Sequence, residues 1–254
     1  MRGGKGTWAV LLALAAGNCV HTMAIGAMRA DFRCIYALDP NGQINIHNLY
    51  GDVSITAWDR DEVLIEAVKK SNDPKRLEDA QIVVDSSGRE LSIRTQYLGA
   101  GGEHPASVEY RIVVPRTANL QNVKLINGGL AISGVSGSIH ASSVNGSIHA
   151  DHLEGQAELT TVNGRLEAGF NRVSRDSAIL LRSVNGPIRL WIPSCADAVL
   201  SARNLSGGIE TQFGKGFRSA AGHRLHTILN RGGARIHVDN TNGGIVIRSS
   251  GPLT

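Results

Sequence analysis

Histidines are the residues of this chain with the most obvious chemistry. His149 and His152 form one pair, His223 and His226 form another, and His140 precedes His149 by nine residues. Neutral imidazoles bind transition metals and also transfer protons near neutral pH. His140 and His149 lie half of an eighteen-residue repeat apart, so we expect them to point in opposite directions and to share no metal. We interpret all five as solvated surface histidines and predict no metal site.

Carboxylates are the second group that could carry chemistry, because glycoside hydrolysis needs two of them flanking one bond. The acids of the repeat region recur at no common position; they are Asp151, Glu154, Glu158 and Glu167. This scatter predicts that no catalytic carboxylate pair exists.

Sequence motifs for nucleophiles and phosphate binding are also missing. The chain has no H-E-x-x-H and no G-x-S-x-G, and Gly214-Lys215-Gly216 lacks the upstream glycine and following hydroxyl of a P-loop. Only long loops could gather reactive groups; these are Tyr97 to Ala106 with Glu103 and His104, Phe170 to Asp176, and Phe213 to His226. None of them combines a nucleophile, a base and an orienting acid. We therefore predict no catalytic, metal-binding or cofactor-binding residues, no cofactor and no enzymatic activity.

A glycine and asparagine repeat dominates residues 126–168. Glycine recurs every nine residues at 128, 137, 146, 155 and 164, and Asn127, Asn145 and Asn163 precede every second one. The full repeat is therefore eighteen residues long and has two similar halves. From Gly164 to Gly186 it lengthens to 22 residues, which predicts a loop around residues 170–176.

Each half-repeat has the alternation of a half-buried β-strand. In one such segment Val144, Gly146, Ile148 and Ala150 share the predicted inner face, while Asn145, Ser147 and His149 share the outer face. A single half-repeat cannot bury its two large apolar side chains alone. Stacked copies can pool them into one core.

Two architectures fit this pattern. In an antiparallel meander, N-G forms a type I′ hairpin turn; in a parallel β-solenoid, glycine marks a bend and successive coils stack. Glycine lies on the predicted inner face between apolar residues, and asparagine recurs once per coil. Both features favour an all-β, parallel β-solenoid of about 18–22 residues per coil.

An irregular β-rich section precedes the regular repeats. It spans residues 28–120 and the regular repeats span 121–254, and we expect one continuous domain over 28–254. One short helix is predicted from Pro74 to Ala80, since Asp73 can cap it and proline suits the first turn. The predicted strands of the section are Val63 to Lys69, Val108 to Val114, and a hairpin of Ile82 to Val84 with Glu90 to Thr95 around Ser86-Ser87-Gly88.

The N-terminus predicts export. Arg2 and Lys5 precede an apolar run from Trp8 to Ala16, and small residues follow up to Ala27. This is the pattern of a signal peptide over residues 1–27. A retained anchor and lipidation at Cys19 are the alternatives. We expect a location in the periplasm, cell envelope or cell surface, without a transmembrane helix in the mature chain.

Charge and cysteine content limit the possible partners. The chain has 26 Lys plus Arg against 22 Asp plus Glu, and removing the signal peptide leaves 24 basic residues. With no basic cluster and few aromatic residues for base stacking, no nucleic-acid partner is predicted. Cys34 and Cys195 could form a disulfide in an oxidising compartment, or could be two small buried residues.

The sequence resembles the bacterial "putative adhesin" domain family. The resemblance is carried by the V-N-G-x-[IL] units beginning at Val144, Val162 and Val184, together with N-G-Q-I-N-I at Asn41, D-E-V-L-I-E-A at Asp61 and E-Y-R-I-V-V-P at Glu109. It spans about residues 32–249. The resemblance implies a right-handed β-helix-like solenoid and no defined activity, because fold alone does not license function.

Two classes of function remain open. The first is a non-enzymatic envelope or surface protein, a scaffold or binding module whose partner is an unknown envelope protein or surface glycan. The second is a solenoid carbohydrate-binding protein or polysaccharide-active enzyme. Sugar binding favours exposed aromatic side chains, and Trp58 and Trp191 are the tryptophans outside the predicted signal peptide.

Overall fold

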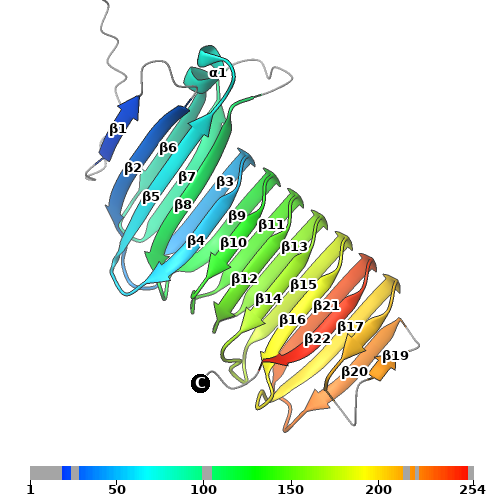
Figure 1. Cartoon of the computed structure of the whole chain (residues 1–254). Helices are drawn as coiled ribbons and strands as arrows, with labels where there is room; N and C mark the ends of the chain where they lie inside the picture. The colour runs from blue at the N-terminus through cyan, green and yellow to red at the C-terminus, as the bar shows by residue number, and fades with distance from the viewer. Residues whose placement is uncertain (1–18, 24–28, 99–104, 214–217, 221–222, 251–254) are drawn as a thin grey trace, which may run out of the picture.

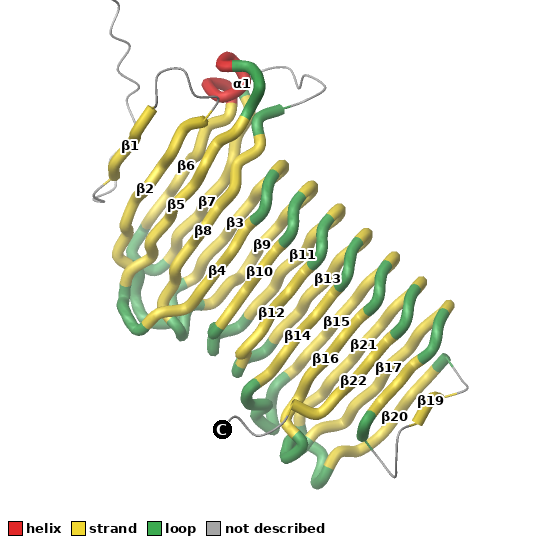
Figure 2. Tube along the Cα trace, viewed as in Figure 1, coloured by secondary structure: helices red, strands yellow, loops and turns green. Residues whose placement is uncertain are grey.

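The computed structural model describes residues 19–23, 29–98, 105–213, 218–220 and 223–250. The described chain is all-β apart from one short helix, α1 (Pro74–Asp79). Its strands form two large sheets that face each other along an elongated molecule (Figure 1). Loops occupy mainly the two long edges where the chain passes between the sheets (Figure 2).

Sheet A has twelve strands and sheet B has ten. In spatial order, sheet A comprises β1 (Cys19–Met23), β2 (Arg29–Ala37), β5 (Glu62–Lys70), β8 (Ser107–Pro115), β4 (Val53–Trp58), β10 (Leu130–Ser133), β12 (Ile148–Leu153), β14 (Leu166–Phe170), β16 (Ile188–Pro193), β22 (Ile245–Ser250), β18 (Ile209–Thr211) and β19 (Arg218–Ala220). Sheet B comprises β20 (Arg224–Leu229), β17 (Ala198–Ser206), β21 (Ala234–Asn242), β15 (Ala178–Asn185), β13 (Ala157–Asn163), β11 (Ile139–Asn145), β9 (Asn119–Asn127), β3 (Gln43–Tyr50), β7 (Glu90–Tyr97) and β6 (Ala80–Ser86).

The eighteen-residue repeat corresponds to one strand in each sheet. The two strands β11 and β12 form one such unit, which we call a rung, and β13 and β14 form the next. Asn145 pairs in parallel with Asn163 in sheet B, and Ile148 pairs in parallel with Leu166 in sheet A. Parallel pairing at this spacing excludes an antiparallel meander for these repeats, so the hairpin alternative is wrong here.

The longer repeat is accommodated as predicted. Thr161 pairs with Ser183, 22 residues later. The extra residues lie between Phe170, where β14 ends, and Ala178, where β15 begins.

The order of rungs in space differs from their order in the sequence at both ends. The rung β21–β22 lies between β15–β16 and β17–β18, and it pairs in parallel with both neighbours. At the other end, β3–β4 lies between β7–β8 and β9–β10. The glycine spacing alone contained no signal for this rearrangement.

The predicted inner face needs one correction, at the corner where β11 leads into β12. Ile148 and Ala150 are buried as predicted, but Val144 is 41% exposed and Ser143 is buried instead. The chain bends after Asn145, so the alternation before the bend is shifted by one residue from that after it. Ser143 is satisfied inside because its Oγ donates to the carbonyl oxygen of Gly128 at 3.1 Å.

Glycine is required at this corner because rungs approach closely there. A Cβ on Gly146 would overlap the carbonyl oxygen of Gly128, and a Cβ on Gly164 would overlap that of Gly146. Gly164 also has a φ of 159°, at the limit of what other residues adopt. This close approach of neighbouring rungs explains why glycine recurs at the corner position of the repeat.

The asparagines of the repeat form a hydrogen-bonded ladder beside the glycine column. Asn145 Nδ2 donates to Asn127 Oδ1 at 3.0 Å, and Asn163 Nδ2 donates to Asn145 Oδ1 at 2.8 Å. Asn185 and Asn242 continue the ladder at 3.0 and 2.9 Å. Each inner member therefore needs both an amide donor and an amide acceptor.

Replacing Asn145 with alanine tests this ladder. The variant loses two exposed hydrogen bonds, so we expect the free energy of unfolding to fall by about 1 kcal/mol, with the fold retained. Asn145→Asp should cost at least as much, because it removes the donor to Asn127. Urea unfolding followed by circular dichroism measures both, and a loss of several kcal/mol for alanine would contradict the proposed minor role of these bonds.

The irregular N-terminal section matches its predicted elements. Asp73 caps α1 by accepting from the Lys75 amide at 3.0 Å, and β5 and β8 contain the two predicted strands. The hairpin is formed by β6 and β7, with Val84 opposite Ile93.

The N-terminal segment and the cysteines depart from the sequence analysis. Residues 19–23 of the predicted signal peptide form β1, which pairs with β2 so that Cys19 lies opposite Cys34; residues 1–18 and 24–28 lie outside the described chain. Cys34 is disulfide-bonded, whereas Cys195 is free and exposed. The predicted alternative of a Cys34–Cys195 bond is therefore wrong, and so is the prediction that Cys195 is buried.

Candidate functional site

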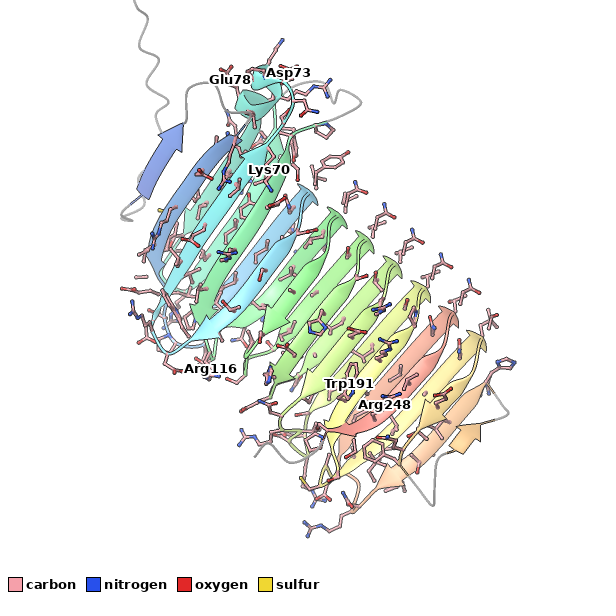
Figure 3. The ribbon with its side chains drawn as sticks, in the orientation of Figure 1. Lys70, Asp73, Glu78, Arg116, Trp191 and Arg248 are labelled. Atoms are coloured by element: carbon pink, nitrogen blue, oxygen red, sulfur yellow. The ribbon has the colours of Figure 1, made fainter. Side chains whose placement is uncertain are left out.

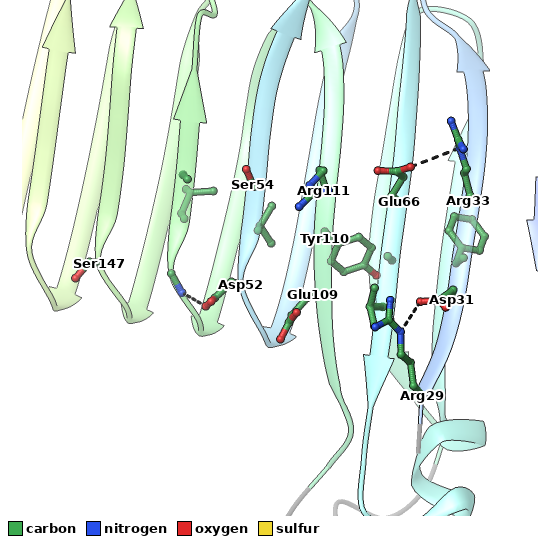
Figure 4. Close-up of a pocket in the computed structure, with 17 residues that line it drawn as sticks. Arg29, Asp31, Arg33, Asp52, Ser54, Glu66, Glu109, Tyr110, Arg111 and Ser147 are labelled. Atoms are coloured by element: carbon green, nitrogen blue, oxygen red, sulfur yellow. Dashed lines mark hydrogen bonds and ion pairs between the residues drawn. The ribbon is translucent and has the colours of Figure 1, made fainter. Parts of the chain in front are cut away.

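The outer face of sheet A contains a depression of about 980 Å³ over β2, β5, β8, β4 and β10 (Figure 4). Strand alternation creates its charged lining, because in β2 the exposed Arg29, Asp31 and Arg33 alternate with the buried Phe32 and Cys34. The remaining charged residues of the lining are Glu66, Glu109, Arg111 and Asp52.

Most of these charges are paired with a neighbour. Arg29 Nε lies 2.9 Å from Asp31 Oδ1, and Arg33 Nε lies 3.5 Å from Glu66 Oε1. On the adjoining strands, Lys70 Nζ lies 2.7 Å from Glu109 Oε2. Asp52 is held by the chain itself, since its Oδ1 accepts from the Gly129 amide at 2.7 Å.

Arg111 is the exception at the centre of the depression. It lies opposite Glu66 on one side and Ser54 on the other, and its side chain forms no ion pair with the described residues. It therefore leaves an exposed guanidinium with five donors available to a ligand. No histidine or cysteine is among the lining residues of this depression, so its chemistry suits binding of a polar or anionic group.

A second polar cluster lies further along the same face, on β12, β14 and β16. His149 Nδ1 lies 3.2 Å from Glu167 Oε2, and His149 Nε2 lies 3.4 Å from Asp151 Oδ2. Arg189 donates to Glu167 at 2.8 Å. The fold thus gathers two acids that appeared scattered in the sequence.

The cluster is internally neutralised. Burial alone would raise the pKa of Asp151, but the Ser133 hydroxyl and the imidazoles of His152 and His149 outweigh it and hold the pKa below its usual value. Oδ1 of Asp151 is 3.2 Å from His152 Nδ1, an ion-pair distance without hydrogen-bond geometry. In the described chain, no group of three or more His, Cys, Asp or Glu side chains is arranged to hold a metal.

The other candidate residues do not converge. His140 is on β11 in sheet B and His149 on β12 in sheet A, which confirms that they face apart. Glu158 lies on β13 in sheet B, and Glu154 is 3.9 Å from Arg172. His226 contacts Ser201 at 3.0 Å.

Several loop predictions fall outside the described residues. Glu103 and His104 lie in the segment 99–104, and Gly214-Lys215-Gly216 lies in 214–217. The predicted loop from Phe170 to Asp176 is described throughout, and Asp176 lies at the surface.

The two tryptophans of the described residues have different settings. Trp58 Nε1 donates to the Glu62 carbonyl at 2.7 Å, and Arg60 covers its ring at 5.1 Å. Trp191 stands on the outer face of sheet A, between Gly169 and Arg248 in the pairing register (Figure 3). It is half-buried and has room beside it, because glycine offers no side chain.

Sequence reasoning missed the depression entirely. Its signal was present as period-two charge alternation, in R-A-D-F-R at residues 29–33 and in E-Y-R at 109–111. That pattern becomes a site only when β2, β5, β8 and β4 are placed side by side, and no repeat spacing indicates that order.

Among the described residues, no helix has the length and hydropathy needed to cross a bilayer. No family model matches the sequence, and no curated protein matches it. The V-N-G-x-I family resemblance therefore stays a prediction.

Solved structures do resemble this one. A "putative cell adhesion protein" from Clostridium sporogenes ATCC 15579 aligns with a TM-score of 0.51 and 13% identity over 86% of this chain and 99% of that chain. A "putative adhesin" from Bacteroides fragilis NCTC 9343 aligns with a TM-score of 0.41, 10% identity, and coverage of 87% and 97%. A "putative lipid binding protein" from Parabacteroides distasonis ATCC 8503 has a TM-score of 0.32, 11% identity, and coverage of 89% and 98%. The first likeness shows that the chain shares its fold with a protein named for cell adhesion.

Proposed function

We propose that this chain is an exported, non-enzymatic β-solenoid of the cell envelope or surface, and that it binds its partner through the outer face of sheet A. The solenoid reading is supported by parallel rungs that recur every 18–22 residues, and its right-handedness is an implication of the family resemblance. The observation that carries the binding role is the depression of about 980 Å³ with Arg111 at its centre.

The composition of the depression favours a polar partner such as a surface glycan or an acidic segment of an envelope protein. Alternating charges on neighbouring strands match a partner with its own polar pattern and give specificity more than raw affinity. The unpaired guanidinium of Arg111 is the group with most to gain from a bound carboxylate or sulfate.

Retention of native envelope material on the immobilised chain tests the proposal. We expect Arg111→Glu to reduce capture of the specific partner at least about tenfold, as for the loss of a charge-assisted contact. Lys75→Glu on α1 is the matched control, because it makes the same charge change outside the depression. Equal capture by both variants would rule out the depression as the site.

A second candidate is carbohydrate binding around Trp191, favoured by its place beside Gly169 and Arg248 on the same face. Binding of a panel of polysaccharides, measured by quenching of tryptophan fluorescence, distinguishes the two candidate sites. Only binding around Trp191 requires the quenching to be lost in Trp191→Ala. We expect no hydrolysis of polysaccharide or ester substrates and no stoichiometric metal; turnover would overturn the non-enzymatic assignment.

A further inference from the structure

The outer face of sheet B carries a row of aliphatic side chains next to the corner, all of them exposed except Val162, which is partly buried. Each member directly precedes the corner residue of its rung, so the row follows the rungs in space; it consists of Leu49, Ile126, Val144, Val162, Val184 and Leu205. We call it the aliphatic ridge. Thr241 occupies the position between Val184 and Leu205. Strands about 4.8 Å apart place these seven positions along roughly 30 Å.

The ridge is too exposed to belong to the core. Val144 and Val184 are 41% and 40% exposed, and Leu205 is 66% exposed. Single exposed aliphatic residues are ordinary, but a row of six that only Thr241 interrupts is typical of a binding surface.

A row of polar residues, most of them basic, flanks the ridge two residues earlier on the same strands and continues onto β7 and β20. Because alternate residues of a strand share a face, they lie beside the ridge on the outside of sheet B. In spatial order from β7 to β20 the positions are Arg94, His47, Lys124, Ser142, Thr160, Arg182, Asp239, Arg203 and Arg224. Six of the nine are basic, so we call this the basic row; Ser142, Thr160 and Asp239 are its other members.

Neutralisation of the basic row is incomplete. Arg94 lies 2.6 Å from Asp85, and Arg182 lies 3.8 Å from Asp239. Lys124, Arg203 and Arg224 have no ion pair within the described part of the chain. The pKa of His47 is lowered below its usual value. Burial is the largest cause, and the positive charges of Lys124 and Arg94 add to it.

From this arrangement we propose that the outer face of sheet B docks on an anionic lipid surface. The ridge supplies shallow apolar contact, and the basic row meets lipid phosphates at the same level. Ser142 and Thr160 add hydroxyls that can bond headgroups. This surface is distinct from the sheet A depression, so the inference goes beyond the proposed function.

Charge decides between a lipid surface and a second copy of the chain. Two copies meeting through the ridge would bring one basic row against another and would have to overcome that repulsion. An anionic bilayer presents a flat surface of opposite charge that can contact the basic row along its whole length.

Co-sedimentation of the purified chain with vesicles tests the docking surface. We expect binding to equimolar phosphatidylcholine and phosphatidylglycerol, little binding to pure phosphatidylcholine, and loss of binding between about 0.1 M and about 0.5 M NaCl. The double variant Lys124→Glu and Arg203→Glu should bind at least about tenfold more weakly. Val144→Ser with Leu205→Ser should also weaken binding, without its salt dependence changing.

Matched controls lie away from sheet B's outer face. Lys75→Glu on α1 repeats the charge change, and Val246→Ser on the outer face of sheet A repeats the loss of a partly exposed aliphatic side chain; both should bind like the parent chain. Circular dichroism confirms folding of each variant, and Lys124→Glu alone serves if a double variant is misfolded. Equal binding to neutral vesicles, equal losses in the controls, or a ridge-dependent dimer without vesicle binding would each overturn the proposal.

Discussion

Ile148→Asp is expected to prevent stable folding, whereas His149→Ala one residue later is expected to leave the protein folded. Ile148 is completely buried between the two sheets and lies between Leu130 and Leu166 in the register of sheet A. A carboxylate there has neither water nor a cationic partner, and the loss of packing adds to the cost. Changes of this kind exceed about 4 kcal/mol, a large part of a domain's stability.

His149 is the natural control because its side chain points to the outside of the same strand. It contacts Glu167 and Asp151 at the surface, and exposed ion pairs of this kind are worth about 1 kcal/mol or less. Thermal unfolding and soluble yield of the two variants provide the measurement. Similar melting temperatures would contradict the assignment of inner and outer faces to β12.

The fold could be predicted from the sequence wherever a single residue type satisfies a single structural requirement. Glycine at every corner, asparagine in a ladder and alternation around Ile148 all follow from parallel rungs stacked at short distance. These demands repeat with every rung, so the pattern was visible in the chain without any knowledge of partners in space.

The errors arose where the backbone departs from the regular strand. Val144 was assigned to the core because alternation was continued through the bend after Asn145. A bend shifts the phase by one residue, and the serine or threonine before the valine becomes the inner residue. The buried Thr161, whose Oγ1 donates to the Gly146 carbonyl at 2.9 Å, shows the same exchange one rung later.

The candidate sites were less accessible to sequence reasoning than the fold. Arg33, Glu66 and Arg111 come from three strands that are far apart in the chain, and only the antiparallel pairing of the irregular section unites them. The ridge was hidden for a different reason, since its valines were counted as core. Surface function in this fold depends on whether each repeated position faces the inside or the outside of its sheet.

Removing residues 234–254 is expected to unfold β17, β18 and β20, which precede these residues in the sequence and form one end of the molecule. The rung β21–β22 separates β15–β16 from β17–β18, and its pairing joins the two. In β21, Ile236 lies between Ile179 and Leu200; in β22, Ile245 lies between Ile188 and Ile209.

The expected loss is large because the removed rung is central rather than terminal. Ile236, Val238, Ile245 and Ile247 are completely buried. Burying such side chains is worth about 1.5–3 kcal/mol each, and repeat proteins derive most of their stability from contacts between neighbouring rungs. The truncated chain should therefore keep β2 to β16 folded and lose protection of β17, β18 and β20.

Hydrogen exchange distinguishes this outcome from simple closure of the gap. If β17–β18 moved onto β15–β16, amides of residues 198–206 would stay protected and the melting temperature would change little. If the inserted rung is the only support of that end, those amides should exchange rapidly while residues 139–170 remain protected. A synthetic peptide of residues 233–250 should then restore protection in the truncated chain, because its strands have a preformed slot with parallel partners on both sides.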